Sequence, residues 1–357
     1  YNTNWTYRKA ITIDADQVSA SLANFPLLVS TNDTHLLAQA ESTGVDIFFT
    51  EDDGITPLDF EIESYSDTTS LVAWVRIPSL SDTTDTTIYM YYGNSSATSS
   101  LENPTFVWDT DYVMVQHLEE TSGDHFDSTS NGNDGTVSVT TQGDATGQIN
   151  GADEFDATSL DSIDCGDNTS LQITGSMTVE AWAYSDNPLN SNRIASKDKT
   201  GETGKFILWE NGTGVLAFIV ADDPIPPTTP SWYRAQGSSV TNGEWFHVVG
   251  VFDANDQEVR LYKNGSEVGS ATTGPITLNP TAETVTIGVS SNGEQHWTGT
   301  IDEVRISKTA RSADWILTSF KNHDDPDLFY NIDTEETVCI LNTDCGVEDA
   351  YLSLIHI

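Results

Sequence analysis

Basic residues are scarce in this sequence. Its 357 residues include 14 Lys and Arg against 55 Asp and Glu, which gives a formal net charge of −41 at pH 7. A chain this acidic repels phosphate backbones, so we expect no nucleic-acid partner. The same repulsion argues against direct binding to an anionic membrane surface.

Long apolar runs and cysteines are scarce as well. No run approaches the roughly 18 apolar residues that a membrane helix needs, so we predict no direct membrane insertion. The chain has 3 cysteines. Cys339 and Cys345 are close enough in sequence to close a short disulfide loop, with three free thiols as the alternative. Cys165 would then be a small buried apolar residue.

Signatures of common catalytic sites are missing. The sequence has no nucleophile-elbow serine, no zinc-ligand spacing and no phosphate-binding glycine loop. Asp59–Glu63 places three carboxylates on one strand face, which resembles the acid and nucleophile of a glycosidase. Spacing also allows His117 to pair with Glu120, and His247 with Asp253. None of these completes a recognisable active site, so we predict that the protein is not an enzyme.

The residue pattern predicts an all-β protein. In Val259–Lys263, alternate residues share one face, as in a half-buried strand. Asn264-Gly265 then favours a tight hairpin. Helix signals are limited to Thr34–Ser42 and Ser312–Asn322. Strands rich in β-branched and aromatic residues are expected at Ala10–Ile13, Asp46–Phe49, Leu71–Ile77, Thr87–Tyr92, Thr178–Ala183, Gly204–Trp209, Val215–Val220, Phe246–Phe252, Val285–Val289 and Gly299–Ile306.

Composition shifts predict the domain boundaries. A small, polar run at residues 94–100 is followed by Pro104, which indicates a linker or surface loop. A second boundary falls near Asp333–Glu336. We therefore predict two β-sandwich domains in tandem, with residues 1–94 as the first domain, 95–105 as a linker, 106–333 as the second domain, and 334–357 as the start of a further region or a sequence artefact.

Six blocks of the first domain carry a resemblance in their order and spacing: residues 5–13, 24–29, 44–50, 58–65, 73–78 and 88–94. They resemble a bacterial and archaeal surface family known as domain of unknown function 2341. The resemblance implies an extracellular β-sandwich, a type of domain that often precedes a lectin-like module.

Six further blocks lie in the second domain, at residues 115–120, 126–136, 176–182, 244–253, 261–265 and 299–306. Together they resemble the concanavalin A-like lectin/glucanase superfamily, in its laminin-G-like branch. The resemblance implies a jelly roll of two antiparallel sheets. It does not by itself name a ligand, because one fold hosts many functions.

The loop Asp127–Asn133 is a candidate metal site. Oxygen-bearing side chains recur at every second position and Gly132 allows a sharp turn, an arrangement suited to Ca²⁺ with its about 6–8 oxygen ligands. The laminin-G-like resemblance adds the Asp that opens the final core strand. The alternative is a polar turn that hydrogen-bonds to itself. We predict a structural Ca²⁺ ion held by Asp127, Asn131, Asn133, Thr136 and Asp302.

The stretch Asp222–Arg234 is a candidate ligand site. It is stiffened by prolines and carries two aromatic rings and a guanidinium, the groups that sugar binding requires. The alternative is that its tryptophan and that of a second loop cap the sandwich core. Trp182, Trp209 and Trp245 are expected in the core. We predict ligand contacts from Trp232, Tyr233, Arg234, Asp222 and Trp297.

These features favour a secreted or cell-surface binding module with a role in carbohydrate binding or adhesion. Several Asn-X-Ser/Thr sequons agree with an extracellular location. The expected partners are glycans or neighbouring surface proteins. One alternative is a structural subunit of an extracellular layer or filament, whose acidity calcium would neutralise. A glycoside hydrolase is the third hypothesis.

Overall fold

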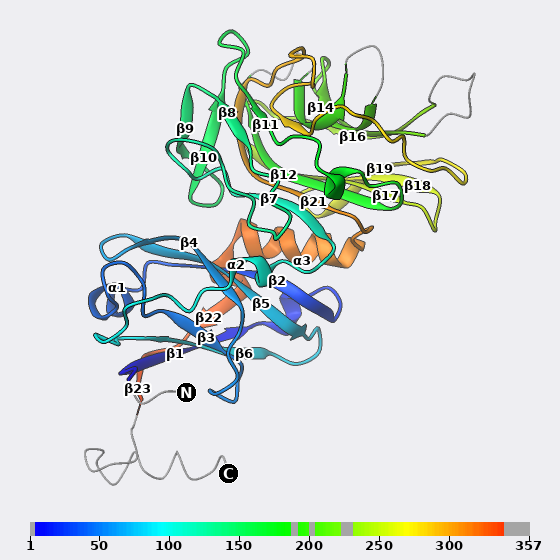
Figure 1. Ribbon diagram of the computed structural model, residues 1–357. Coiled ribbons are helices and arrows are strands. Elements are labelled where there is room, and N and C mark those ends of the chain that lie inside the picture. The colour runs from blue at the N-terminus through cyan, green and yellow to red at the C-terminus, as the bar shows by residue number, and fades with distance from the viewer. Residues whose placement is uncertain (1–3, 187–191, 200–203, 223–230, 339–357) are drawn as a thin grey trace. The chain divides into compact units, whose positions relative to one another are not determined.

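The computed structural model describes residues 4–186, 192–199, 204–222 and 231–338 (Figure 1). Nearly all its regular elements are antiparallel strands, which confirms the all-β prediction. The chain divides into two units, one formed by Trp108–Asp324 and the other by the residues on both sides of it. Among the described helices, none has the length and apolar character needed to cross a membrane. Cys165 is buried as predicted, whereas Cys339 and Cys345 lie outside the described residues.

The first unit is completed by strands from far along the chain. Strand β1 (Tyr7–Ile13) pairs with β6 (Thr86–Tyr92) on one side and with β22 (Tyr330–Ile332) and β23 (Glu336–Thr337) on the other. The predicted tandem order therefore does not describe this chain, because the second unit is inserted in the first. Pairing satisfies the backbone groups of β1, which would otherwise form a sheet edge.

The first unit packs two sheets on each other. The first sheet has the order β22-β1-β6-β3, with β3 at Phe48–Thr50, and the second has the order β2-β5-β4. The second sheet comprises β2 (Leu22–Thr31), β4 (Phe60–Ser66) and β5 (Ser70–Leu80). Phe49 and Phe60 join the two sheets, with ring centroids 5.3 Å apart. The other elements are η1 (Ala15–Gln17), α1 (Thr34–Gln39), α2 (Pro104–Val107) and α4 (Pro326–Phe329).

The second unit is a sandwich of an eight-stranded and a seven-stranded sheet, seen as two layers in Figure 1. The eight-stranded sheet comprises β7 (Tyr112–Gln116), β9 (Thr141–Thr146), β10 (Gly151–Phe155), β12 (Met177–Ser185), β17 (Trp245–Asp253), β18 (Glu258–Lys263), β19 (Ser266–Thr272) and β21 (Gly299–Ser307). The seven-stranded sheet comprises β8 (Thr136–Ser138), β11 (Ser162–Asp164), β13 (Asn192–Asp198), β14 (Gly204–Asn211), β15 (Val215–Ala221), β16 (Trp232–Ser239) and β20 (Thr286–Ile287).

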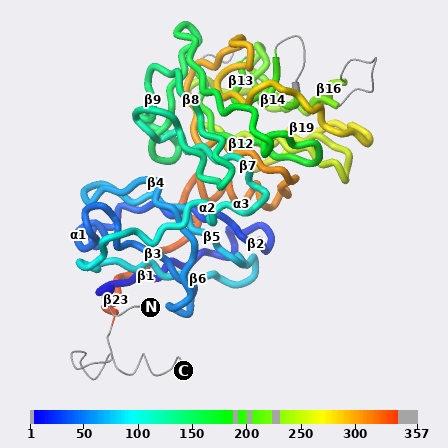
Figure 2. Tube along the Cα trace, viewed as in Figure 1, coloured from blue at the N-terminus to red at the C-terminus, as the bar shows by residue number. Residues whose placement is uncertain are grey.

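Glycines allow the two layers to approach closely. A Cβ atom on Gly250 of β17 would lie 2.1 Å from the ring of Phe218 on β15. At the side of the sandwich, a Cβ on Gly237 of β16 would lie 1.9 Å from the carbonyl oxygen of Val268 on β19. Figure 2 shows β16 and β19 side by side at this point. Small residues here let the sheet edges meet and close the core.

A helix covers the outward face of the eight-stranded sheet. Helix α3 (Ala313–Asp324) packs its Ile316 against Val249, Val251 and Tyr262. The predicted hairpin is confirmed: Asn264 has φ +50° and Gly265 has φ +73°, and these two residues join β18 to β19. The remaining described helix of this unit is η2 (Thr169–Leu171).

Candidate ligand-binding face

The outward face of strands β14–β16 carries aromatic and polar side chains. Phe206 and Leu208 of β14 point into the core, so Trp209 points to the opposite side. The strand register aligns Trp209 with Ala217 and then with Gln236 across the sheet. In β16, Arg234 lies opposite Ile219 and Trp232 opposite Ala221. Trp209, Trp232, Arg234 and Gln236 therefore share one face of the sheet.

Two guanidinium groups lie on the ring of Trp209. The Cζ atom of Arg193 is 4.7 Å from the ring centroid, and that of Arg234 is 5.5 Å from it. Both distances are in the range of a cation–π interaction. These contacts link β13, β14 and β16 and hold the indole ring in a defined position.

The two arginines differ in their partners. Arg193 is 4% exposed and donates to both carboxylate oxygens of Asp198, at 3.3 and 3.1 Å. Arg234 is exposed, and within the part of the chain that the structure describes it has no carboxylate partner. Trp232, next on the same face, has 41% of its surface exposed. The face thus presents one unpaired cation and one open aromatic ring to solvent.

Of the five predicted ligand residues, the structure places some on the outward face and others away from it. Trp232 and Arg234 point outward, but Tyr233 points inward and packs against the core. The carboxylate of Asp222 accepts the N–H of Ser231 at 2.5 Å, which places it at the base of its loop; residues 223–230 of that loop lie outside the described residues. Trp297 is 0% exposed in the core, so its predicted role in ligand binding is wrong. Its indole is excluded from solvent, as the core-cap alternative requires.

Of the three tryptophans expected in the core, Trp182 is buried as predicted, and the other two need correction. Trp209 lies on the outward face of β14. Its position directly after the core residue Leu208 in an alternating strand predicts this orientation. Trp182 is 2% exposed and is buried under helix α3, stacked on Phe320 with ring centroids 5.9 Å apart. Trp245 is only half-buried.

The Asp127 loop is held together by hydrogen bonds. One oxygen of the Asp127 carboxylate accepts the N–H groups of Val115 (3.0 Å) and Thr129 (2.9 Å). The other oxygen accepts the N–H of Asn133 and the hydroxyl of Thr129, both at 2.9 Å. Four donors therefore occupy the lone-pair positions of this carboxylate. Burial raises the pKa of Asp127, and these bonds oppose that rise.

The other predicted calcium ligands have protein partners too. The Asn131 amide donates to the Thr129 hydroxyl at 3.0 Å, and the Asn133 amide donates to the Val113 carbonyl at 2.6 Å. Thr136 begins strand β8. The Asp302 carboxylate, on β21, accepts the N–H of Ile149 at 2.8 Å. The donor set at Asp127 does not fit a cation as it stands and favours the self-bonded turn. The predicted Ca²⁺ ion is untested, and a calcium titration decides between the ion and the turn.

A buried histidine bridges two carboxylates at another place in this unit. His125 is 0% exposed, with Nδ1 bonded to Glu120 and Nε2 lying 2.8 Å from Asp153. Burial lowers the pKa of His125, but the hydrogen bonds to Asp153 and Glu120 outweigh it and raise the pKa to about 9. The predicted pairing of Glu120 with His117 is wrong, since His117 bonds to Glu303 at 2.7 Å.

The second predicted histidine pair is not formed either. His247 lies against the ring of Trp182, with centroids 5.2 Å apart, and burial lowers its pKa to about 3. Asp253 instead lies 3.7 Å from a guanidinium nitrogen of Arg260. A neutral histidine under a helix supports packing rather than proton transfer.

The strand carboxylates of the first unit have structural partners. Asp59 pairs with Arg76 and accepts the side-chain amide of Asn103 at 2.7 Å. Glu63 accepts the indole N–H of Trp74 at 2.8 Å. These bonds tie β4 to β5 and to the following segment. These structural contacts account for Asp59 and Glu63 in this strand, and a catalytic pair of a glycosidase is not needed to explain them.

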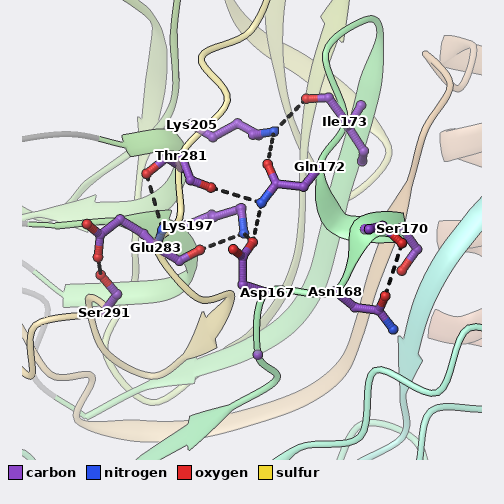
Figure 3. A network of polar contacts seen from close by, with 12 residues as sticks. Asp167, Asn168, Ser170, Gln172, Ile173, Lys197, Lys205, Thr281, Glu283 and Ser291 are labelled. Atoms are coloured by element: carbon purple, nitrogen blue, oxygen red, sulfur yellow. Dashed lines mark hydrogen bonds and ion pairs between the residues drawn. The ribbon is translucent and has the colours of Figure 1, made fainter.

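Two buried lysines, Lys197 and Lys205, bond to the loops beside β13 and β14, as Figure 3 shows. These strands carry Arg193 and Trp209. Lys197 of β13 bonds to Asp167 and donates to the Glu283 carbonyl at 2.6 Å. Lys205 of β14 donates to the Ile173 carbonyl at 2.8 Å, and burial lowers its pKa to about 8. Both amines anchor the ends of β13 and β14 to neighbouring loops.

Two family models match the chain. Residues 156–317 match the concanavalin A-like lectin/glucanases superfamily, and residues 43–138 match the domain of unknown function 2341. These matches confirm both resemblances. The match to the domain of unknown function 2341 ends at residue 138, within the second unit, which begins at Trp108. No curated protein matches the sequence.

Solved structures show a weaker likeness. The binding domain of Paraclostridial Mosquitocidal Protein 1 has 12% identity and a TM-score of 0.47, covering 59% of this chain and 52% of its own. The botulinum neurotoxin serotype D binding domain has 16% identity and a TM-score of 0.44, covering 59% and 51%. The CBM40 of a Ruminococcus gnavus IT-sialidase, bound to α2,3-sialyllactose, has 12% identity and a TM-score of 0.36, covering 42% and 85%. The chain spans about half the length of the two toxin structures.

Proposed function

We propose that the second unit, which carries the concanavalin A-like lectin/glucanases segment, is a carbohydrate-binding module that acts outside the cell. The observation that carries this proposal is the outward face of β14–β16. It combines the open ring of Trp232 with the polar groups of Arg234 and Gln236, next to Trp209, whose ring is contacted by two guanidinium groups. Indole rings stack on the apolar faces of sugars, and polar side chains fix the hydroxyl groups.

The proposal is binding without catalysis. The acidic residues that suggested an active site take part in structural contacts: Asp59 with Arg76, Glu63 with Trp74 and Glu120 with His125. The outward face itself supplies a cation and aromatic rings, but a glycosidase requires two carboxyl groups across the scissile bond. Retention of a glycan without cleavage is the activity that these groups support.

A glycan-array assay with the whole chain tests the proposal. We expect Trp232→Ala to weaken binding about two- to tenfold, because a stacked aromatic contributes about 0.5–1.5 kcal/mol beyond its buried area. Phe126→Ala is the matched control, since Phe126 is 65% exposed in the same unit but lies in the loop before Asp127. Equal binding by the Trp232→Ala variant and the wild type would overturn the assignment of this face. If the wild type binds no glycan, the proposal fails and the structural-subunit hypothesis gains support.

A further inference from the structure

We infer that the glycan recognised by this face carries negative charge, and that Arg234 is the group that binds its carboxylate or sulfate. The inference deepens the proposed function and rests on it. It starts from one juxtaposition: an exposed guanidinium on the aromatic face of the sheet, beside Trp209 and two residues from Trp232.

Arg234 stands apart from the other arginines of the chain. All the arginines lie among the described residues, and each of the others has an acidic partner. In a chain with 55 acidic residues such pairing is expected. The pairs are Arg8 with Glu336, Arg76 with Asp59, Arg193 with Asp198, Arg260 with Asp256 and Glu258, Arg305 with Glu180 and Glu303, and Arg311 with Asp109.

The neighbours of Arg234 on the sheet supply no carboxylate. Ile219 lies directly across from it, and Trp232 and Gln236 flank it on the same face of β16. Its described contact is the ring of Trp209. The other cation on that ring, Arg193, is already neutralised by Asp198. Among the described residues no carboxylate neutralises Arg234, so its charge is available to a ligand.

Hydrogen-bond donors are also in excess around Trp209. The indole Nε1 of Trp209 and the Nη1 of Arg193 are both buried and, among the residues described, have no hydrogen-bond partner. Buried donors without acceptors are uncommon and costly. Together with Arg234 they make the region rich in donors and poor in acceptors. Carboxylate and sulfate groups supply several acceptor oxygens, and a guanidinium binds them in a bidentate manner.

The net charge of the protein makes this inference easy to test. At −41, the chain as a whole repels polyanions, so non-specific electrostatic adsorption does not imitate a site. Binding of an acidic polysaccharide then requires a local cationic group. Because divalent ions can bridge two carboxylates, the assay must contain a chelator.

The experiment measures binding of the whole chain to matched polysaccharides in about 0.15 M salt with chelator. Polygalacturonate is compared with its methyl ester, and dextran sulfate with dextran, so that each pair differs in charge on one backbone. Arg234→Met keeps much of the side-chain length and removes the charge, whereas Arg234→Lys keeps the charge and loses the bidentate fork. Arg260→Met is the control, because it removes the same charge from a paired arginine in the same unit.

We expect binding to an anionic polysaccharide that is at least tenfold tighter than binding to its neutral counterpart. Arg234→Met should reduce that affinity about tenfold or more, Arg234→Lys should reduce it less, and Arg260→Met should leave it unchanged. Preference for polygalacturonate identifies a carboxylate ligand, and preference for dextran sulfate identifies a sulfate; either result supports the inference.

Two results would overturn it. Equal binding of charged and neutral polysaccharides would show that the ligand need not be anionic, whereas the proposed glycan-binding function would still hold. An anionic preference that Arg234→Met does not change would remove Arg234 from the site. If no glycan of any kind is bound, the proposed function fails together with the inference.

Discussion

The hydroxyl group of Tyr330 bonds to both backbone groups of Ser30. It accepts the Ser30 N–H at 2.8 Å and donates to the Ser30 carbonyl oxygen at 3.0 Å. Tyr330 lies in β22 and Ser30 in β2, so the contact joins the two sheets of the first unit. It also joins residues 300 positions apart in the sequence.

Replacing Tyr330 with Phe should destabilise the first unit. The substitution removes one hydroxyl and leaves two polar groups of Ser30 without their partner; the Tyr330 side chain is 4% exposed. We expect the free energy of unfolding to fall by about 1–3 kcal/mol, which urea denaturation followed by tyrosine and tryptophan fluorescence measures. Tyr89→Phe is the control in the same unit, because among the described residues its hydroxyl forms no hydrogen bond. Equal effects of the two substitutions would contradict this account.

The bridge between Glu120, His125 and Asp153 predicts a loss of stability at alkaline pH. The pKa of His125 is about 9 in the folded chain, above the about 6.5 of an unfolded one. A raised pKa stabilises the protein fully below about pH 6.5, and that contribution disappears as the pH rises through about 9. We expect a loss of about 2–3 kcal/mol over this window in urea denaturation.

Asp153→Asn isolates the contribution of His125, because other groups titrate in the same range. Lys205, for example, has a pKa of about 8 and its titration changes stability in the opposite direction. Removing the Asp153 charge lowers the pKa of His125, so the variant should lose less stability than the wild type between pH 6.5 and 9.5. If the ring signal assigned to His125 titrated near 6.5 in the wild type, the bridge would be refuted.

Gly250 should tolerate no side chain. A Cβ atom there would lie 2.1 Å from the Phe218 ring, so Gly250→Ala must displace a core residue of the opposite sheet. We expect a loss of about 1–3 kcal/mol, measured by chemical denaturation. Gly175→Ala serves as the control, since a Cβ at Gly175 meets no atom within 4 Å. Similar stability of the Gly250→Ala variant and the wild type would show that the sheets are not packed this closely.

A calcium titration separates the two interpretations of the Asp127 loop. Because four protein donors already occupy the Asp127 carboxylate, we expect the thermal midpoint to stay unchanged when millimolar Ca²⁺ replaces chelator. A calcium-dependent rise that disappears in Asp127→Asn and persists in Asp156→Asn would instead support the predicted ion. Asp156 is a suitable control because it accepts a hydrogen bond within an exposed turn of the same unit.

Local patterns predicted local structure well. Alternation placed Val259 and Leu261 on one side of a strand, and both lie in the core. The expected helices at Thr34–Ser42 and Ser312–Asn322 correspond to α1 and α3. Such features depend on neighbouring residues, whose spacing the sequence displays directly.

Features that depend on distant contacts were less accessible. The sequence does not reveal that β1 pairs with β22 and β23. Strands pair through their backbones, and paired strands can be separated by any number of residues. Burial of Trp297 depends on packing from both sheets, which its loop-like sequence does not reveal. Trp209 was assigned to the core because aromatic residues in strands are often buried, although its phase points to the other face.

The register of β1 also determines how the chain carries mechanical load. Tyr7 pairs with Thr337 and Ile13 with Tyr330, so a pull applied outside residues 7 and 337 acts at the same end of this antiparallel seam. Its hydrogen bonds are then loaded one after another, as in a zipper, rather than all at once in shear. Residues 108–324 form a loop in the covalent path and bear no tension until the seam has opened. Under tension, the first unit therefore yields before force reaches the unit that carries Trp232 and Arg234.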